Sequence, residues 1–342
     1  MARRPTIADL ARESGVSVAT VDRVLNARHP VRQETTRRVA EAASVIGYHA
    51  AGLIKQRLRQ DLPQYRMGFI LQRPSQPFYQ SFARELESAV TGAQSFRGIA
   101  QIDYVESQTP TEMSRKLRDV AARSRAVAMV SVDHPTINAT VAELKEKGVP
   151  VFSLLSDFAA GVRAGYVGLD NRKVGRTAAW IIAKAAKSPG KVAVFVGSHR
   201  FLGQEMREIG FRSYFRELAP QFELIETVVN LEAGELAHEA TLDLLKRHPE
   251  LIGFYVAGGG MEGAISALRE ENMADRLVAV FNELTPDSRA GLAENIATMV
   301  IHTPLERLCR ELVAQMAAAI ERRGDMPGET FLPFDVFTSE NI

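Results

Sequence analysis

The sequence contains almost no cysteine or tryptophan, and it has no long hydrophobic run. Its single cysteine, Cys309, excludes an internal disulfide and suits a reducing compartment. The flanking residues ERLCRELV are typical of a helix, so Cys309 is expected to be a structural thiol. No apolar stretch is long enough to span a membrane, and the opening MARRPTIADL lacks the apolar segment of a signal peptide. We therefore expect a cytoplasmic protein with no membrane partner.

The 342 residues are too many for one ordinary core, so two or three domains are predicted. The formal net charge is only +1, but the charges are unevenly placed. Residues 1–66 carry twelve Lys and Arg against six Asp and Glu, whereas the other residues carry 30 against 35. A basic N-terminal module joined to a mildly acidic body indicates nucleic-acid contact at the N-terminus only.

Residues 6–26, TIADLARESGVSVATVDRVLN, have the pattern of two short helices joined by a tight turn. Gly15 allows a positive φ in the turn, and the Ser17 hydroxyl is placed to cap the second helix. This arrangement is the helix-turn-helix pattern, in which the second helix enters the DNA major groove. An ordinary helical hairpin within a larger core is the alternative. The apolar positions on the inner faces are Ile7, Leu10, Ala11, Val21, Val24 and Leu25.

A third amphipathic helix is predicted over residues 31–46, ending at Gly47 as its C′ residue. The predicted DNA-binding domain therefore spans residues 1–48. Residues 49–59 are helical in propensity but have little to pack on, and the stretch from Asp61 to Tyr65 breaks the pattern. Residues 49–66 are accordingly predicted to form a hinge helix and linker.

From residue 67 onward, apolar strands alternate with amphipathic helices, which predicts an α/β fold with parallel, doubly wound sheets. About 275 residues exceed one such sheet, so two lobes are expected. We predict a first lobe of residues 67–160 and 303–326 and a second lobe of residues 161–302 and 327–342. Ligands of these folds bind outside the carboxyl ends of the strands, so the cleft between the lobes is the expected binding site.

The head, TIADLARESGVSVATVDRVLN followed by VRQETTRRVAEAASVIGY, resembles that of the lactose-repressor (LacI/GalR) family of bacterial transcription regulators. The body, with QPFYQSF, VGLDNRKVG, MREIGF and IHTPLER, resembles the periplasmic sugar-binding proteins whose core this family shares. The resemblance implies a two-lobed core and a homodimer that places two heads on a near-palindromic operator. It also implies a regulator, typically a repressor, controlled by a sugar, polyol or sugar acid. Dimerisation would involve the first lobe, including residues 78–94.

The resemblance makes residues 18–25 the recognition helix. Val18 and Ala19 then take the base-choosing positions, where they can read only shape or thymine methyl groups, and Arg23 reaches a base edge. Asp22 stands where the family usually has serine; it either accepts from cytosine N4 or pairs with an arginine. Residues expected to contact phosphates or brace the helix are Thr6, Ser17, Thr20, Asn26 and Arg32.

The same resemblance implies that the hinge helix inserts a leucine into the minor groove. Two departures stand out, because Ala50 replaces the usual proline and Arg57 occupies the expected leucine position. Leu58, one residue later, is our candidate for the inserted side chain. A flexible linker whose leucine packs on the body is the alternative.

For the effector pocket, the resemblance points to aromatic rings that stack on a sugar and to polar groups that bind its hydroxyls. Arg207 matches the pocket arginine, whose guanidinium can bind two oxygens at once. Gly258, Gly259 and Gly260 replace a polar stretch, which leaves either a wider pocket or binding by backbone amides. The candidate residues are Phe78, Tyr79, Asp133, His134, Asp157, Asp170, Arg207, Asn282 and His302.

Two other classes remain open. An α/β enzyme acting on a sugar or sugar phosphate, with an accessory helical module, would use the three glycines as a phosphate cradle. They fit neither a dinucleotide nor a P-loop motif, so this indication is weak. An exported solute-binding protein fits the body but not the basic head. The seven histidines form no clustered ligand set, so neither a metal nor another cofactor is expected.

Overall fold

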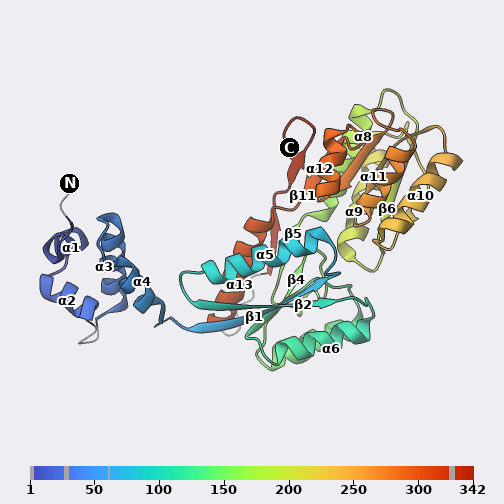
Figure 1. The fold of residues 1–342 in the computed structure, drawn as a ribbon. Helices are drawn as coiled ribbons and strands as arrows, with labels where there is room; N and C mark the ends of the chain where they lie inside the picture. Colours follow the sequence, from blue (N-terminus) through green and yellow to red (C-terminus); the bar gives the residue numbers. More distant parts are fainter. Residues whose placement is uncertain (1–3, 27–30, 61, 323–327) are drawn as a thin grey trace. The chain divides into compact units, whose positions relative to one another are not determined.

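The computed structural model describes residues 4–26, 31–60, 62–322 and 328–342 (Figure 1). The chain divides into two compact units. One contains residues 1–65 with residues 91–99, and the other contains residues 66–90 with residues 100–342. Each is described by itself below.

The first unit contains four helices, and residues 4–60 are called the head. The helices are α1 (Ile7–Ser14), α2 (Val18–Asn26), α3 (Gln33–Val45) and α4 (Ala51–Gln60). Helix α1 begins with a capping box, in which Thr6 and Asp9 satisfy each other's backbone N–H groups. Gly15 has φ 64°, and the Ser17 hydroxyl accepts from the Thr20 N–H at 3.2 Å, as the sequence predicts for the turn and the cap.

The core of the head is small. Gly47 has φ +66° after α3, and the Tyr48 N–H then donates to the Ala43 carbonyl at 2.8 Å. Helix α4 is formed by residues that were predicted to belong to the hinge. It packs on α3 and buries Ile54 in the same core. The expectation that this segment has little to pack on is therefore corrected. The buried members are Leu10, Ala11, Val21, Val24, Val39, Ala40, Ala42, Ala43, Tyr48 and Ile54.

The first of two sheets has the strand order β12-β5-β4-β3-β1-β2. Every pairing from β1 through β3, β4 and β5 to β12 is parallel. Figure 1 shows α5 and α6 on opposite faces of this sheet. With the helices that cover it, this sheet forms the first lobe. Its elements are β1 (Gln64–Gln72), α5 (Pro77–Gly92), β2 (Arg97–Val105), α6 (Pro110–Ala121), β3 (Ala126–Met129), α7 (Pro135–Glu146), β4 (Val151–Leu154), β5 (Gly165–Leu169), α13 (Leu305–Arg322) and β12 (Gly328–Leu332).

The second sheet has the order β13-β11-β10-β9-β6-β7, and β8 also pairs with β6. Only β13 is antiparallel to its partner among the pairings described for this sheet. This sheet and its helices form the second lobe. They are α8 (Asn171–Ala185), β6 (Lys191–Val196), α9 (Leu202–Leu218), β7 (Glu223–Leu224), β8 (Val228–Val229), α10 (Gly234–Arg247), β9 (Leu251–Val256), α11 (Met261–Glu270), β10 (Val278–Asn282), α12 (Pro286–Ala293), β11 (Met299–His302) and β13 (Asp335–Phe337).

The sheets divide the chain differently from the predicted lobe boundaries. Strand β5, expected to open the second lobe, pairs with β4 in the first sheet, and β12 joins β5 there. A buried strand followed by a helix has the same sequence pattern whichever sheet receives it, so periodicity alone misplaces this boundary. The chain passes between the lobes three times, at residues 170, 303–304 and 333–334. No helix in the described ranges is long and apolar enough to cross a membrane.

Candidate functional site

The exposed face of α2 presents three side chains that the sequence assigns to base reading. Val18 is 50% exposed although it is a large apolar residue, and Ala19 and Arg23 are also exposed. The opposite face buries Val21 and Val24 in the core of the head. Arg23 has no ion pair or hydrogen bond with any residue that the structure describes. Its guanidinium is therefore available to an external acceptor.

The polar candidates around α2 bind mainly to each other. The Ser17 and Thr20 hydroxyls lie 2.9 Å apart, and the Asn26 amide donates to the Asp22 carboxylate at 2.7 Å. Within the described residues, Asp22 therefore pairs with Asn26, one turn later, and with no arginine. The Thr6 hydroxyl donates to Asp9 at 2.7 Å. These contacts brace the helix ends, whereas Arg23 has no such partner among the described residues.

The two remaining candidates lie on later helices. Arg32 is exposed at the start of α3 and makes no side-chain capping hydrogen bond. Leu58 falls within α4, but its side chain lies outside the described part of the structure. Whether Leu58 is the inserted side chain therefore stays a prediction.

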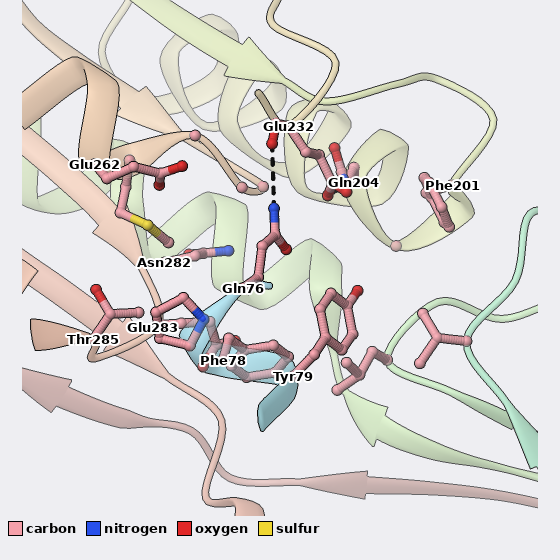
Figure 2. Close-up of a pocket in the computed structure, with 18 of the residues that line it drawn as sticks. Gln76, Phe78, Tyr79, Phe201, Gln204, Glu232, Glu262, Asn282, Glu283 and Thr285 are labelled. Atoms are coloured by element: carbon pink, nitrogen blue, oxygen red, sulfur yellow. Dashed lines mark hydrogen bonds between the residues drawn. The ribbon is translucent and has the colours of Figure 1, made fainter. Parts of the chain in front are cut away.

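A cavity of about 360 Å³ lies between the two lobes, at the carboxyl ends of several strands (Figure 2). The first lobe contributes the loop before α5, the start of α5 and the ends of β3 and β4. The second lobe contributes α9, the loops after β8, β9 and β10, and the start of α11. Figure 2 shows Phe78 and Tyr79 below the cavity, with Glu232 and Glu262 above them.

Arg207 is the one arginine among the lining residues, and it is only 8% exposed. Its Nε donates to Asn171 Oδ1 at 2.7 Å and its Nη1 to the Ala257 carbonyl at 2.8 Å. Both acceptors are neutral, and no residue in the described ranges accepts from Nη2. The guanidinium is thus held rigidly, with one nitrogen left for a ligand oxygen.

Asn282 and Gln204 are fixed in the same way. The Asn282 amide donates to the Ala257 carbonyl at 3.1 Å, and its Oδ1 accepts from the Tyr255 hydroxyl at 2.9 Å. Gln204 accepts from the Gly197 N–H at 2.6 Å and donates to the Glu232 carboxylate at 2.6 Å. Gln76, from the first lobe, donates to the Glu232 carbonyl at 3.2 Å, which Figure 2 marks with a dashed line. These hydrogen bonds hold polar side chains in single orientations around the cavity.

Glu283 lines the cavity but is bound from behind. Its Oε2 accepts from the Thr303 N–H at 2.9 Å and lies 3.1 Å from His302 Nδ1, and its Oε1 accepts from the Thr303 hydroxyl at 2.7 Å. Burial alone would raise the pKa of Glu283, but the hydrogen bonds from His302 and Thr303 and the charge of Arg207 outweigh it. The pKa of Glu283 is therefore lowered, and the carboxylate is ionised.

Tyr79 supplies both an aromatic ring and a hydroxyl. It is 8% exposed, and its ring centroid lies 5.2 Å from that of Phe78 in an edge-to-face arrangement. Burial, together with the negative charges of Glu232 and Glu283, raises the pKa of Tyr79 well above its usual value. No described residue forms a hydrogen bond with this hydroxyl, which stays protonated and can donate to a ligand.

The backbone is strained around this cavity. Leu155, Glu232 and Glu283 all line it and have φ of 60°, 55° and 67°, a region that residues other than glycine rarely adopt. Backbone strain of this kind is held in place by surrounding structure and gathers at binding and catalytic sites. Its concentration here supports the cavity as the functional site of the two-lobed unit.

The three glycines leave room for neighbouring side chains. A Cβ on Gly258 would lie 2.7 Å from Gln204 Oε1, and a Cβ on Gly259 would lie 3.0 Å from Glu232 Cβ. The glycines let Gln204 and Glu232 approach the loop closely, so that two polar side chains from elsewhere line the cavity. Whether the loop also binds a ligand through its backbone amides stays a prediction.

Comparison with known proteins identifies both units. Residues 6–50 match the profile of "Bacterial regulatory proteins, lacI family", and residues 67–324 match "Periplasmic binding protein domain". The chain belongs to the LacI/GalR family of transcriptional regulators. Its family consists of DNA-binding regulators, which are not enzymes.

Individual relatives of this LacI/GalR regulator agree over most of its length. An HTH-type transcriptional regulator from Streptomyces limosus is 25% identical over 82% of this chain and 79% of its own. The sucrose operon repressor of Streptococcus mutans is 23% identical over 98% of this chain and 99% of its own. An ABC transporter solute-binding protein from Agrobacterium vitis, solved with bound D-fucose, has a TM-score of 0.75 at 15% identity. It covers 81% of this chain and 96% of its own, and it establishes the fold of the two-lobed unit.

Four of the nine predicted effector residues of the regulator line the cavity, namely Phe78, Tyr79, Arg207 and Asn282. The structure gives four others different partners. Asp133 accepts from Asn138 and from the Ala159 N–H, and His134 caps α7. Asp157 forms an ion pair with the buried Arg163, and Asp170 caps α8. These polar residues follow strands as expected, but they stabilise loops and helix starts outside the cavity lining.

His302, the ninth, also lies outside this lining and contacts the cavity only through Glu283. It lines a second hollow, which shares Pro77, Phe78 and Thr285 with the first. In the structure His302 therefore contacts the cavity lining through Glu283, and a direct contact with ligand stays a prediction.

Several lining residues were missed from the sequence. Gln204 lies one turn before Arg207 on α9, and that spacing could have revealed it. Glu283 directly follows Asn282 in the sequence, so its position at the cavity could also have been predicted. Glu232 and Glu262 have no such marker, because the first lies in an irregular loop and the second on a helix start that resembles any exposed turn.

Proposed function

We propose that this regulator is a homodimeric repressor of a near-palindromic operator and that a small polyhydroxylated ligand in the cavity controls its DNA affinity. The observation that carries the proposal is the cavity between the lobes, where fixed polar groups converge beside two aromatic rings. The exposed face of α2 supplies the DNA-reading surface. A regulator of this kind acts in the cytoplasm.

The chemistry of the lining suits hydroxyl groups. Arg207 and Tyr79 offer donors that no described residue uses, and the carboxylates offer acceptors. Phe78 and Tyr79 can pack on the C–H face of a sugar ring. The sugar found in the solute-binding protein of the same fold supports a ligand of this size. A sugar, a polyol or a sugar acid fits this description.

We further propose that ligand and operator are linked through the angle between the two lobes. Such coupling typically amounts to about 1–3 kcal/mol, and it is reciprocal, so operator DNA must change ligand affinity by the same factor. The regulator binds its ligand without converting it.

The test uses the full-length protein and a duplex selected from a randomised near-palindromic library. Fluorescence anisotropy would measure operator affinity with and without each member of a panel of sugars, polyols and sugar acids. We expect at least one compound to change the Kd by about 5–150-fold, and NMR should recover it unchanged. Selection of no specific duplex, or operator affinity that no compound alters, would contradict the proposal.

A further inference from the structure

The cavity lining carries more negative than positive charge. Four carboxylates, Glu232, Glu262, Glu283 and Asp287, line it, against the single guanidinium of Arg207. They come from four separate segments: the loop before α10, the start of α11, the end of β10 and the start of α12. The excess is therefore a property of the folded cavity and not of one acidic stretch.

The four carboxylates differ in how well the protein satisfies them. Glu283 accepts three contacts from Thr303 and His302. Glu232 is 8% exposed, yet only one of its carboxylate oxygens accepts a hydrogen bond, from Gln204. No described side chain donates a hydrogen bond to the carboxylates of Glu262 or Asp287, although Glu262 accepts one from its own backbone N–H. The unsatisfied negative charge therefore gathers at the second-lobe side of the cavity.

The excess of negative charge affects the pKa of one of these carboxyl groups. Burial, followed by the charges of Asp287 and Glu232, raises the pKa of Glu262, with Arg73 opposing the shift. Arg73 lies outside the lining, and its Nη2 donates to the Leu231 carbonyl at 2.7 Å. The cation that opposes the raised pKa of Glu262 therefore lies outside the cavity lining.

We propose that the ligand of this cavity carries a protonated amine as well as hydroxyl groups, as an amino sugar does, and that Glu232 and Glu262 bind its ammonium group. The inference rests on the proposed function and specifies its ligand class. The ammonium supplies three donors to carboxylate oxygens that lack them. Hydroxyls at the other end of the ligand reach Arg207, Asn282 and Tyr79.

The aromatic side of the cavity agrees with this orientation. Figure 2 places Phe78 and Tyr79 across the cavity from Glu232 and Glu262. A cationic ring-bearing ligand between them gains attraction from the aromatic faces as well as from the carboxylates. A sugar acid bound in this same orientation would place its carboxylate among Glu232, Glu262 and Asp287, where like charges repel it.

The experiment compares matched probes on the full-length protein by isothermal titration calorimetry. The probes are D-glucosamine, D-glucose and D-glucuronate, with D-galactosamine, D-galactose and D-galacturonate as a second series. We expect the amine of at least one series to bind about tenfold more tightly than its neutral counterpart, because charge-assisted hydrogen bonds are roughly twice as strong as neutral ones. The acid of that series should bind most weakly.

Substitutions test which carboxylates cause the preference for the amine. Glu262→Gln should weaken binding of the amine by about tenfold and binding of the neutral sugar by less, which reduces the preference for the amine. Asp287→Asn, at an exposed position, should reduce the preference in the same direction. Glu271→Gln, one position beyond α11 and exposed, is the matched control and should change neither affinity.

Three results would overturn the inference: equal or tighter binding of the neutral or acidic probes, an unchanged amine preference in both cavity variants, or no binding by any of the six compounds. The proposed function fails differently. A compound that binds in the cavity without altering operator affinity would leave the amine preference intact and contradict the regulatory role.

Discussion

The head and the cavity differ in how they present the groups proposed to bind DNA and ligand. The head presents Val18, Ala19 and Arg23 on the exposed face of one nine-residue helix, and the polar residues beside them form two pairs, Ser17 with Thr20 and Asp22 with Asn26. The cavity gathers buried groups from distant segments, and Arg207 and Glu283 are held by residues that face away from the ligand. A substitution on the exposed face of α2 should therefore affect one contact, whereas a substitution in the cavity should also disturb the hydrogen bonds of neighbouring residues.

The largest predicted effect concerns the small core on which the reading surface depends. Leu10→Ala should destabilise the head by about 2–5 kcal/mol, because Leu10 is 0% exposed and few other side chains can fill the space. Hydrogen exchange should show lost protection in α1–α3, with the two-lobed unit unaffected, and operator binding should disappear. Leu53→Ala removes the same atoms from an exposed position of α4 and is the control. Unchanged protection in Leu10→Ala would contradict the proposed core.

Because Arg207 lines the cavity and also donates hydrogen bonds to its neighbours, Arg207→Ala should change both the stability of the protein and its response to ligand. The variant leaves Asn171 Oδ1 without the Arg207 donor and leaves the Ala257 carbonyl with the Asn282 amide as its side-chain donor, at a cost of about 1–3 kcal/mol in stability. It should also lose the response to ligand while still binding operator, which urea unfolding and anisotropy would measure. Arg216→Ala, on the exposed side of the same helix, should change neither quantity. A normal response in Arg207→Ala would remove Arg207 from the binding site.

A single effect is predicted for Arg23→Ala, because Arg23 has no partner among the described residues. Operator affinity should fall by about 1–3 kcal/mol and discrimination at one base pair should relax, while the melting temperature stays the same. Anisotropy titrations on the selected duplex and its single-base variants would show both changes. Arg37→Ala, an exposed arginine on α3, is the matched control. Equal losses on all duplexes would indicate a phosphate contact instead.

The smallest predicted effect is a dependence on pH that belongs to the cavity. The pKa of Glu283 is lowered in the folded protein, so its contribution to stability is present above the ordinary glutamate pKa and is lost as pH falls through the lowered one. Urea unfolding of the two-lobed unit should therefore lose more stability between neutral and acidic pH in the wild type than in Glu283→Gln. Parallel pH profiles would contradict this role for Glu283.

The contrast between the head and the cavity also explains which features could be predicted from the sequence. The turn at Gly15, the cap at Ser17 and the helix end at Gly47 depend on neighbouring residues, and all three were predictable. Strand and helix periodicity likewise predicted two α/β lobes. The placement of β5 and β12 depends on strand pairing between distant segments, so their sheet could not be inferred from local pattern.

The cavity shows the same limit at the level of side chains. Asp133, Asp157 and Asp170 occupy strand ends, as a binding residue would, but a polar residue there also caps a helix or holds a loop. Family resemblance placed Arg207 and Asn282 at the cavity, where the structure also places them. Glu232 reaches the cavity from a loop of unusual backbone geometry, which no local pattern predicts.

The chain's last crossing between the lobes has a genetic consequence. Residues 328–342 contribute β12 to one edge of the first sheet and β13 to one edge of the second. A frameshift or premature stop shortly before residue 328 would therefore strip an edge strand from both lobes at once. Although such a mutation would spare the whole DNA-reading head, it should yield a regulator that no longer senses its ligand.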